Sequence, residues 1–166
     1  MENNDKKLNN EVHHISGIIH VLLYHSYVVF LLAIVLGIIS DAIFTFGKFQ
    51  GSIYQIIGLL MIIIGTFIVF WAQKTTSYKK IEAQKDRDTN FFIKGPYRYT
   101  RNPTNFGLSL MSLGLGFIIG SLFSIIFVVI TYFISKLIFI KRQDSILEER
   151  YGEVFNDYKK KVKNWL

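Results

Sequence analysis

The 166-residue sequence contains no cysteine. This absence excludes disulfide bonds, thiolate ligands for a metal ion and a cysteine nucleophile. Only two prolines occur, and both lie in the segment 95–107. Charged residues make up 19% of the chain but are missing from three long blocks, whereas a soluble core alternates apolar and polar residues. The length fits a single domain.

The first two charge-free blocks have the length of membrane spans. No Asp, Glu, Lys or Arg occurs in residues 12–40 or 49–73. A helix needs about 20 apolar residues to cross roughly 30 Å of hydrocarbon. Each block therefore predicts one transmembrane helix, near 17–40 and 53–73. The first block is too long for a typical secretory signal, so we interpret it as a retained anchor.

The third block, residues 102–135, contains 34 residues. One helix of that length would extend about 51 Å, which is too long for a single span. We predict a tight hairpin of two helices, 103–118 and 121–141, with its turn in the glycine-rich segment GLGFIIGS. One continuous kinked helix is the alternative. Gly116 and Gly120 also form a GxxxG pattern, a close-packing face that is available for a homodimer.

These spans predict an all-α fold class: a polytopic membrane protein with four transmembrane helices and a cytoplasmic C-terminal helix. Of the 19 Lys and Arg residues, eight lie in the loop 74–102 and eight from Lys136 onward. Loops rich in these residues stay in the cytoplasm, so we place this loop, the tail 142–166 and both termini there. The expected location is a bacterial-type plasma membrane. Residues 1–14 form a polar tail before a single membrane domain, 15–166.

The charge and the histidines favour neither nucleic acid nor metal. The net charge of +7 comes from residues that flank the spans, so it reflects topology and attraction to anionic headgroups. The histidines are His13, His14, His20 and His25, and no carboxylate partner lies nearby in the sequence. His20 and His25 are five residues apart, which does not place them on one helix face. We expect interfacial or packing roles for them and no metal site.

Residues 95–107, GPYRYTRNPTNFG, stand between the charged loop and the third span. Pro103 suits the first turn of the next helix, and Asn102 suits its N-cap. A helix N-terminus has free N–H groups and a partial positive charge, and Arg98 and Arg101 precede this one directly. We predict a site for a molecule that carries a carboxylate, with flat surfaces from the two tyrosines. The alternative is that the arginines and tyrosines only anchor the chain at the membrane interface.

Residues 141–162, KRQDSILEERYGEVFNDYKKKV, continue the fourth span out of the membrane as a charged helix. Gln143 and Asp144 lie at its exit, on the same side of the membrane as Arg101. The Tyr-Gly pair at 151–152 marks a break. Apolar residues give the segment one apolar side, so it is expected to fold back and close a polar pocket.

The two segments together resemble the isoprenylcysteine carboxyl methyltransferase family, whose wider group includes the phospholipid N-methyltransferases. The first family pattern is Gly-Pro-Tyr-Arg-Tyr-x-Arg-(His/Asn)-Pro-x-Tyr-x-Gly. The second, Glu-Glu-x-x-Leu-x-x-x-Phe-Gly-x-x-Tyr-x-x-Tyr, follows after a hairpin. The resemblance covers residues 95–162 and departs at two places, because Asn105 stands for a Tyr and Gln143-Asp144 for the Glu pair.

This resemblance implies an integral membrane methyltransferase that uses S-adenosylmethionine, acts on a lipophilic acceptor at the cytoplasmic leaflet and releases S-adenosylhomocysteine. Arg101 is expected to hold the cofactor carboxylate, and Asp144 to pair with its amino group or lie near its sulfonium; both are the expected catalytic residues. The acceptor group is a carboxylate or another oxygen or nitrogen group; an amine must first lose a proton. The expected cofactor-binding residues are Gly95, Pro96, Tyr97, Arg98, Tyr99, Arg101, Asn102, Pro103, Asn105, Gln143 and Asp144.

Two rival functions stay open. The membrane sterol reductases have a similar Arg-(Asn/His)-Pro-Asn-Tyr-x-Gly-Glu segment and use NADPH, but Leu108 stands here after Gly107 in place of Glu. A non-catalytic relative that kept the fold is the other rival. For the favoured function, the expected partners are the lipophilic acceptor and membrane lipid, with no nucleic acid.

Overall fold

The computed structural model describes residues 24–44, 49, 51–82 and 93–162. This part of the chain is helical and contains no strand, which confirms the all-α fold class. Its elements are Tyr24–Phe44, α2 (Ser52–Glu82), the short 3-10 helix η2 (Gly95–Arg98), α3 (Pro103–Ile119), α4 (Leu122–Tyr151) and α5 (Glu153–Lys161).

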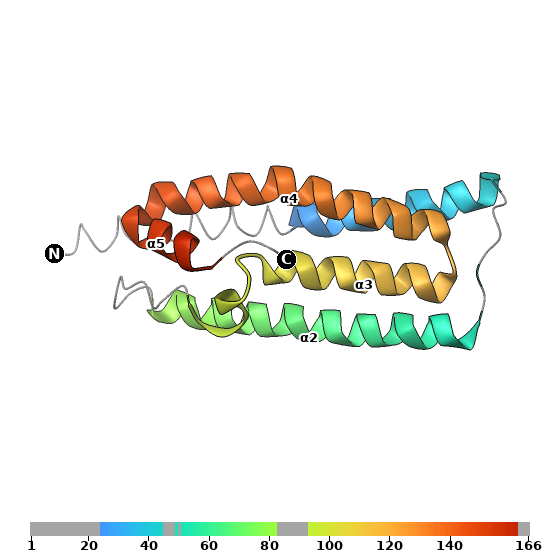
Figure 1. Ribbon diagram of the computed structural model, residues 1–166, viewed down its shortest axis with the longest axis horizontal. Coiled ribbons are helices and arrows are strands. Elements are labelled where there is room, and N and C mark those ends of the chain that lie inside the picture. Colours follow the sequence, from blue (N-terminus) through green and yellow to red (C-terminus); the bar gives the residue numbers. More distant parts are fainter. Residues whose placement is uncertain (1–23, 45–48, 50, 83–92, 163–166) are drawn as a thin grey trace.

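The long helices run side by side along the long axis of the molecule (Figure 1). Helix α3 lies between α2 and α4 and packs against both. The helix Tyr24–Phe44 packs against α4, where the Ser124 hydroxyl donates a 3.2 Å hydrogen bond to the carbonyl of Ile34. At the other end of α4, the short helix α5 turns back toward the segment that leads into α3.

A two-residue turn joins α3 to α4. Gly120 has the left-handed φ of 72° that favours glycine, and its N–H bonds to the carbonyl of Phe117. The N–H of Ser121 bonds to the carbonyl of Gly116 at 3.0 Å, which completes a Schellman motif. The turn lies inside the predicted glycine-rich segment, so the hairpin is confirmed and the continuous kinked helix is excluded.

Paired glycines hold α2 and α3 close together. A Cβ atom built on Gly58 would lie 2.5 Å from the carbonyl oxygen of Gly114, and one on Gly65 would lie 2.6 Å from that of Gly107. The two pairs are seven residues, or two turns, apart on each helix, so the backbones meet twice along one seam. Small residues of this kind let transmembrane helices approach each other without a large side chain between them.

The predicted GxxxG face has a different role. Gly116 faces α4 of the same hairpin, since a Cβ there would lie 2.9 Å from Cγ1 of Ile125. Gly120 lies beyond the end of α3 and forms the turn, so the two glycines do not share one helical face. The homodimer stays a prediction without this support.

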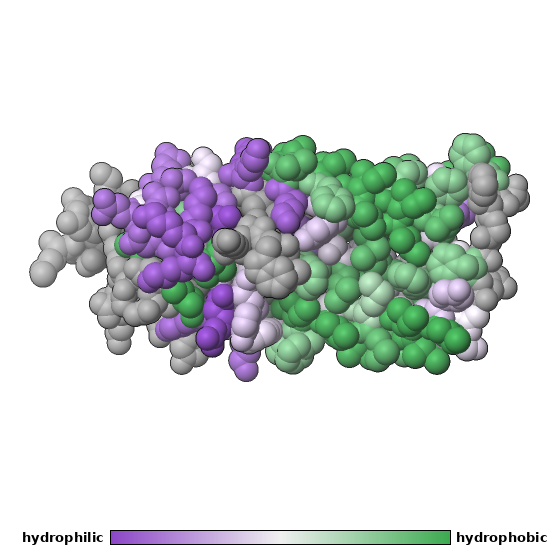
Figure 2. Space-filling view, viewed as in Figure 1, coloured by the Kyte–Doolittle hydropathy of each residue, from purple (hydrophilic) through white to green (hydrophobic). Residues whose placement is uncertain are grey.

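The outer surface of the helices is apolar. Two helical stretches, Tyr24–Phe44 and Ser52–Thr75, are long enough to cross a membrane and each has a mean hydropathy of 2.5. Only 11% of the most apolar part of Ser52–Thr75 is buried, so it is not the core helix of a soluble protein. Pro103–Ile119 and Leu122–Ile138 are shorter apolar stretches. Figure 2 shows apolar side chains along the bundle and polar ones gathered at the end where α5 lies.

The helices run further than the sequence blocks indicated. Helix α2 continues to Glu82, so residues 74–82 are helical although we assigned them to a loop. Helix α4 runs without interruption to Tyr151 and includes the first part of the predicted tail. The described part of the first helix begins at Tyr24 and ends at Phe44, four residues beyond the predicted end. Charge marks where a span leaves the membrane, but a helix can continue into water.

Candidate functional site

The segment before α3 is fixed against α2. Gly95 adopts a φ of 58° at the start of η2, and its backbone packs directly on the side chain of Thr75 in α2. Pro96 and Pro103 are buried, and α3 begins at Pro103 as the proline in its first turn suggests. This arrangement holds residues 99–102 at the polar end of the bundle.

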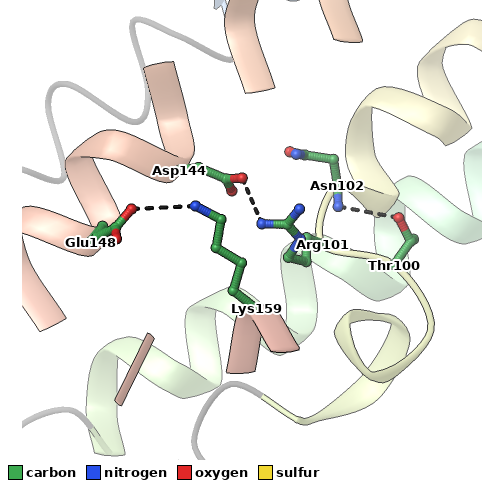
Figure 3. A network of polar contacts seen from close by, with 6 residues as sticks. All are labelled: Thr100, Arg101, Asn102, Asp144, Glu148 and Lys159. Atoms are coloured by element: carbon green, nitrogen blue, oxygen red, sulfur yellow. Dashed lines mark hydrogen bonds and ion pairs between the residues drawn. The ribbon is translucent and has the colours of Figure 1, made fainter. Parts of the chain in front are cut away.

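Asn102 occupies the N-cap position of α3, but its side chain makes no capping hydrogen bond. Its backbone N–H instead donates to the hydroxyl of Thr100 at 3.4 Å (Figure 3). The predicted position of the cap is therefore correct, but Asn102 does not cap the helix with its side chain. Because the side chain of Asn102 does not cap the helix, this end of α3 keeps N–H groups that the N-cap residue does not bond.

A buried ion pair joins Arg101, just before α3, to Asp144 in the last part of α4. Arg101 donates from its terminal Nη1 to Oδ2 of Asp144 at 2.6 Å, and the two side chains are only 12% and 14% exposed (Figure 3). The two segments therefore meet, as their positions in the sequence predict. Burial raises the pKa of the Asp144 carboxyl, although Arg101 and Lys159 act in the opposite direction.

Two polar atoms near the start of α3 are buried without a partner. They are Nε of Arg101 and Oδ1 of Asn105. A buried polar atom without a hydrogen bond costs about 1–3 kcal/mol, so such atoms mark places where a ligand can supply the missing bond. The guanidinium of Arg101 thus has one N–H donor, at Nε, that makes no hydrogen bond. Asp144 uses only one of its two oxygens for Arg101.

Helix α5 closes over the segment that leads into α3. Gly152, with a φ of 53°, ends α4 and lets the chain turn back, as the Tyr-Gly pair predicted. The hydroxyl of Tyr158 donates a 2.7 Å hydrogen bond to the carbonyl of Tyr97. Phe155, Tyr158 and Val162 are buried together, and an exposed pair between Lys159 and Glu148 spans 3.3 Å (Figure 3).

The structure does not bring all of the predicted residues to the ion pair. Arg98 is exposed, and its guanidinium carbon lies 5.4 Å from the ring centre of Tyr99, which is itself 56% exposed. Tyr97 is half-buried and contributes its backbone carbonyl to the contact with α5. The side chain of Gln143 lies outside the described residues, so its predicted role stays a prediction.

Tyr158 was missing from the predicted site. It is 3% exposed, and burial raises the pKa of its hydroxyl. The signal was present, because Tyr158 fits the last position of the second family pattern.

The predictions for the histidines lie mostly outside the described residues. His13, His14 and His20 are among those not described, and His25 is exposed with its ring edge-on to Tyr24. A cavity of about 280 Å³ lies at the opposite end of the bundle from the ion pair. The start of α2 and the end of α3 line it, with Tyr54, Gln55 and Phe117 among its walls.

An apolar outer surface over long helices, with a charged site at one polar end, defines a helical membrane protein. A model of the phospholipid methyltransferase family matches residues 53–154, more than half of the chain. The chain belongs to this family, which confirms the resemblance found in the sequence. The matched range contains α2 from its second residue onward, the segment before α3, the hairpin and the ion pair. No curated protein and no solved structure matches the chain.

Proposed function

We propose that the chain is an integral membrane methyltransferase that moves a methyl group from S-adenosylmethionine to a lipophilic acceptor at the cytoplasmic leaflet. The observation that carries the proposal is the buried pair of Arg101 and Asp144, which lies within the part of the chain that matches the family. The match to a methyltransferase family also favours this function over an NADPH-dependent reductase.

The proposed topology has four spans with both termini in the cytoplasm. Helix α3 has 17 residues and extends about 26 Å, close to the roughly 30 Å of the hydrocarbon layer. Asp144 lies 22 residues after Leu122, about 33 Å along α4. Both members of the ion pair therefore fall at one membrane surface, on the side that carries most of the Lys and Arg residues.

The chemistry of the pair fits the amino-acid end of the cofactor. Arg101 keeps a buried Nε–H without a partner, which can donate to the cofactor carboxylate beside the bond to Asp144. Asp144 has a second oxygen for the ammonium group. The same pair of opposite charges can thus hold both charges of an amino acid.

When bound, the cofactor supplies a methyl group on a cationic sulfur, so the acceptor's lone pair takes the methyl carbon while the electrons of the broken C–S bond remain on sulfur. The chain's residues align the reactants and exclude water. Helix α5 covers the site through Tyr158 and Tyr97, and the apolar outer face of the bundle lets a lipid enter sideways from the bilayer.

The acceptor group is a carboxylate, another oxygen group or an amine. An ionised carboxylate needs no base. A protonated amine must lose its proton, and Asp144, whose pKa is raised by burial, is the nearby carboxylate that can accept it.

Arg101→Gln tests the site. We expect the variant to remain folded but to bind S-adenosylhomocysteine at least about 100-fold more weakly, because the donor for the ligand carboxylate is gone. Isothermal titration calorimetry in detergent measures the affinity. Arg98→Gln is the matched control, since it removes the same charge three residues away at an exposed position.

Equal affinity in Arg101→Gln and the unmodified protein would overturn the proposed site. If the unmodified protein bound no S-adenosylhomocysteine and transferred no radiolabelled methyl group to a lipid extract, the non-catalytic relative would be favoured instead.

A further inference from the structure

Ser135 in α4 is completely buried, and its hydroxyl oxygen makes no hydrogen bond. This is unusual for a hydroxyl in a helix, which commonly bonds back to a carbonyl of its own helix. Examples among the described residues are the hydroxyls of Ser40, Thr75 and Ser109, which bond to the carbonyls of Leu36, Trp71 and Phe106. The hydroxyl of Ser135 is thus left with its full capacity for hydrogen bonding.

Asn105 in α3 lies at the same depth in the bundle. Ser135 comes 14 residues after Ser121, and Asn105 comes 15 residues before Gly120. Because α3 and α4 run antiparallel from this turn, the two residues lie about 21 and 23 Å from it. Oδ1 of Asn105 is also buried without a partner.

Both residues belong to faces that point into the bundle. Ser135 follows Val128 by two turns, and Asn105 precedes Leu108 by about one turn, so each lies on the same side of its helix as that residue. Val128 and Leu108 belong to one buried cluster. Ser135 and Asn105 therefore lie on facing sides of the hairpin at one depth.

This depth is on the hydrocarbon side of the ion pair. Ser135 precedes Asp144 by nine residues, about 13.5 Å along α4, and Asn105 follows Arg101 by four residues. A lipid that enters from the bilayer meets this level before it reaches the charged pair. An unpartnered polar group so far from water is costly unless another molecule bonds to it.

We propose that Ser135 and Asn105 bind the polar group of the acceptor lipid and orient it toward the charged pair. This inference rests on the proposed methyltransferase function. The unpartnered atom of Asn105 is an acceptor oxygen, whereas Ser135 can both donate and accept. The complementary group is one that donates a hydrogen bond, an O–H or an N–H. The proposal also moves Asn105 from the cofactor to the acceptor.

The test uses the full-length protein loaded with S-adenosylhomocysteine in detergent. Native mass spectrometry measures its occupancy by three probe lipids: phosphatidylethanolamine with an N–H group, hexadecanol with an O–H group, and oleate with an ionised carboxylate. We expect phosphatidylethanolamine or hexadecanol to bind more tightly than oleate. Ser135→Ala and Asn105→Ala are each expected to weaken that binding about tenfold and to leave the affinity for S-adenosylhomocysteine unchanged.

Ser124→Ala is the matched control. Ser124 is also completely buried in α4, but its hydroxyl already bonds to Ile34 near the turn. This variant is expected to lower thermal stability without changing lipid occupancy. If Ser135→Ala retained the lipid as the unmodified protein does, or if oleate bound best, the inference would be wrong.

A weaker affinity of Asn105→Ala for S-adenosylhomocysteine would also overturn the inference, because it would return the amide to the cofactor. The failure of the proposed function has a different result. In that case the unmodified protein would not bind S-adenosylhomocysteine at all.

Discussion

The two ends of the α3–α4 hairpin differ in whether their buried polar groups have hydrogen-bond partners. At the turn, the hydroxyls of Ser121 and Ser124 bond to each other at 2.5 Å, and Ser124 also reaches the carbonyl of Ile34. At the other end, Arg101, Asn105 and Ser135 each have a buried polar atom without a partner. The turn end satisfies its hydroxyls within the protein, whereas the other end keeps hydrogen-bonding capacity for a ligand.

The contrast holds within the hairpin, and Asp41 is an exception outside it. It lies near the turn end of the helix Tyr24–Phe44, is 6% exposed and has one buried oxygen without a partner. Asp41 belongs to the helix Tyr24–Phe44 and is not part of the hairpin. Within the hairpin, we therefore expect substitutions at the turn to change only the stability of the protein. Substitutions at the ion pair should change both the stability and the ligand affinity, and the two effects can be measured separately.

The largest expected effect comes from Asp144→Ala. This change leaves the guanidinium of Arg101 buried without its anion, so we expect the free energy of unfolding to fall by about 3 kcal/mol. The double variant Arg101→Met/Asp144→Leu removes both charges and is expected to recover most of this stability but no affinity for S-adenosylhomocysteine. Equilibrium unfolding in detergent and calorimetry measure the two quantities.

Glu148→Ala is the control for this prediction. Glu148 pairs with Lys159 at 3.3 Å, but the two side chains are 44% and 40% exposed. The loss of such a pair is expected to change the stability by less than about 1 kcal/mol. If the double variant still bound S-adenosylhomocysteine as tightly as the unmodified protein, the ion pair would be purely structural and the contrast between the two ends would be lost.

A smaller effect, on stability alone, is expected for Gly120→Ala. Gly120 has a φ of 72°, and a Cβ there would collide with the carbonyl oxygen of Phe49. We expect the free energy of unfolding to fall by about 2 kcal/mol, with no change in the affinity for S-adenosylhomocysteine. Gly51→Ala is the control, because the nearest atom to its Cβ would be a ring carbon of Tyr54 at 3.4 Å, an ordinary contact. Weaker binding in Gly120→Ala would contradict the separation of the two ends.

The sequence was sufficient to predict the elements that composition controls directly. The charge-free blocks predicted apolar helices, the glycine cluster predicted the turn at Gly120, and Gly152 marked the end of α4. The meeting of Arg101 and Asp144 could also be predicted, because a hairpin returns the chain to the surface from which it started.

The remaining features depend on how helices are placed relative to one another. The pairs Gly58–Gly114 and Gly65–Gly107 become visible only when the register between α2 and α3 is known. Whether the hydroxyl of Ser135 is buried without a hydrogen-bond partner depends on which side of α4 faces the interior. An apolar sequence does not reveal this side, because lipid-facing and buried positions are both apolar in a membrane protein.

The smallest expected effect is a pH dependence, and it sharpens the contrast because one carboxyl controls two quantities in opposite directions. Burial raises the pKa of Asp144 in the folded protein above its ordinary value of 3.8. A carboxyl whose pKa is raised by folding contributes stability below its unfolded pKa, and this contribution is lost as the pH rises through the folded pKa. Relative to Asp144→Asn, the unmodified protein should therefore lose stability as the pH rises from 3.8 through the raised folded value.

Over the same window its affinity for S-adenosylhomocysteine should increase, because the ligand's ammonium group binds the ionised carboxylate. Unfolding and calorimetry at several pH values measure both slopes against the Asn variant. Two slopes of the same sign would show that Asp144 does not contact the ammonium group.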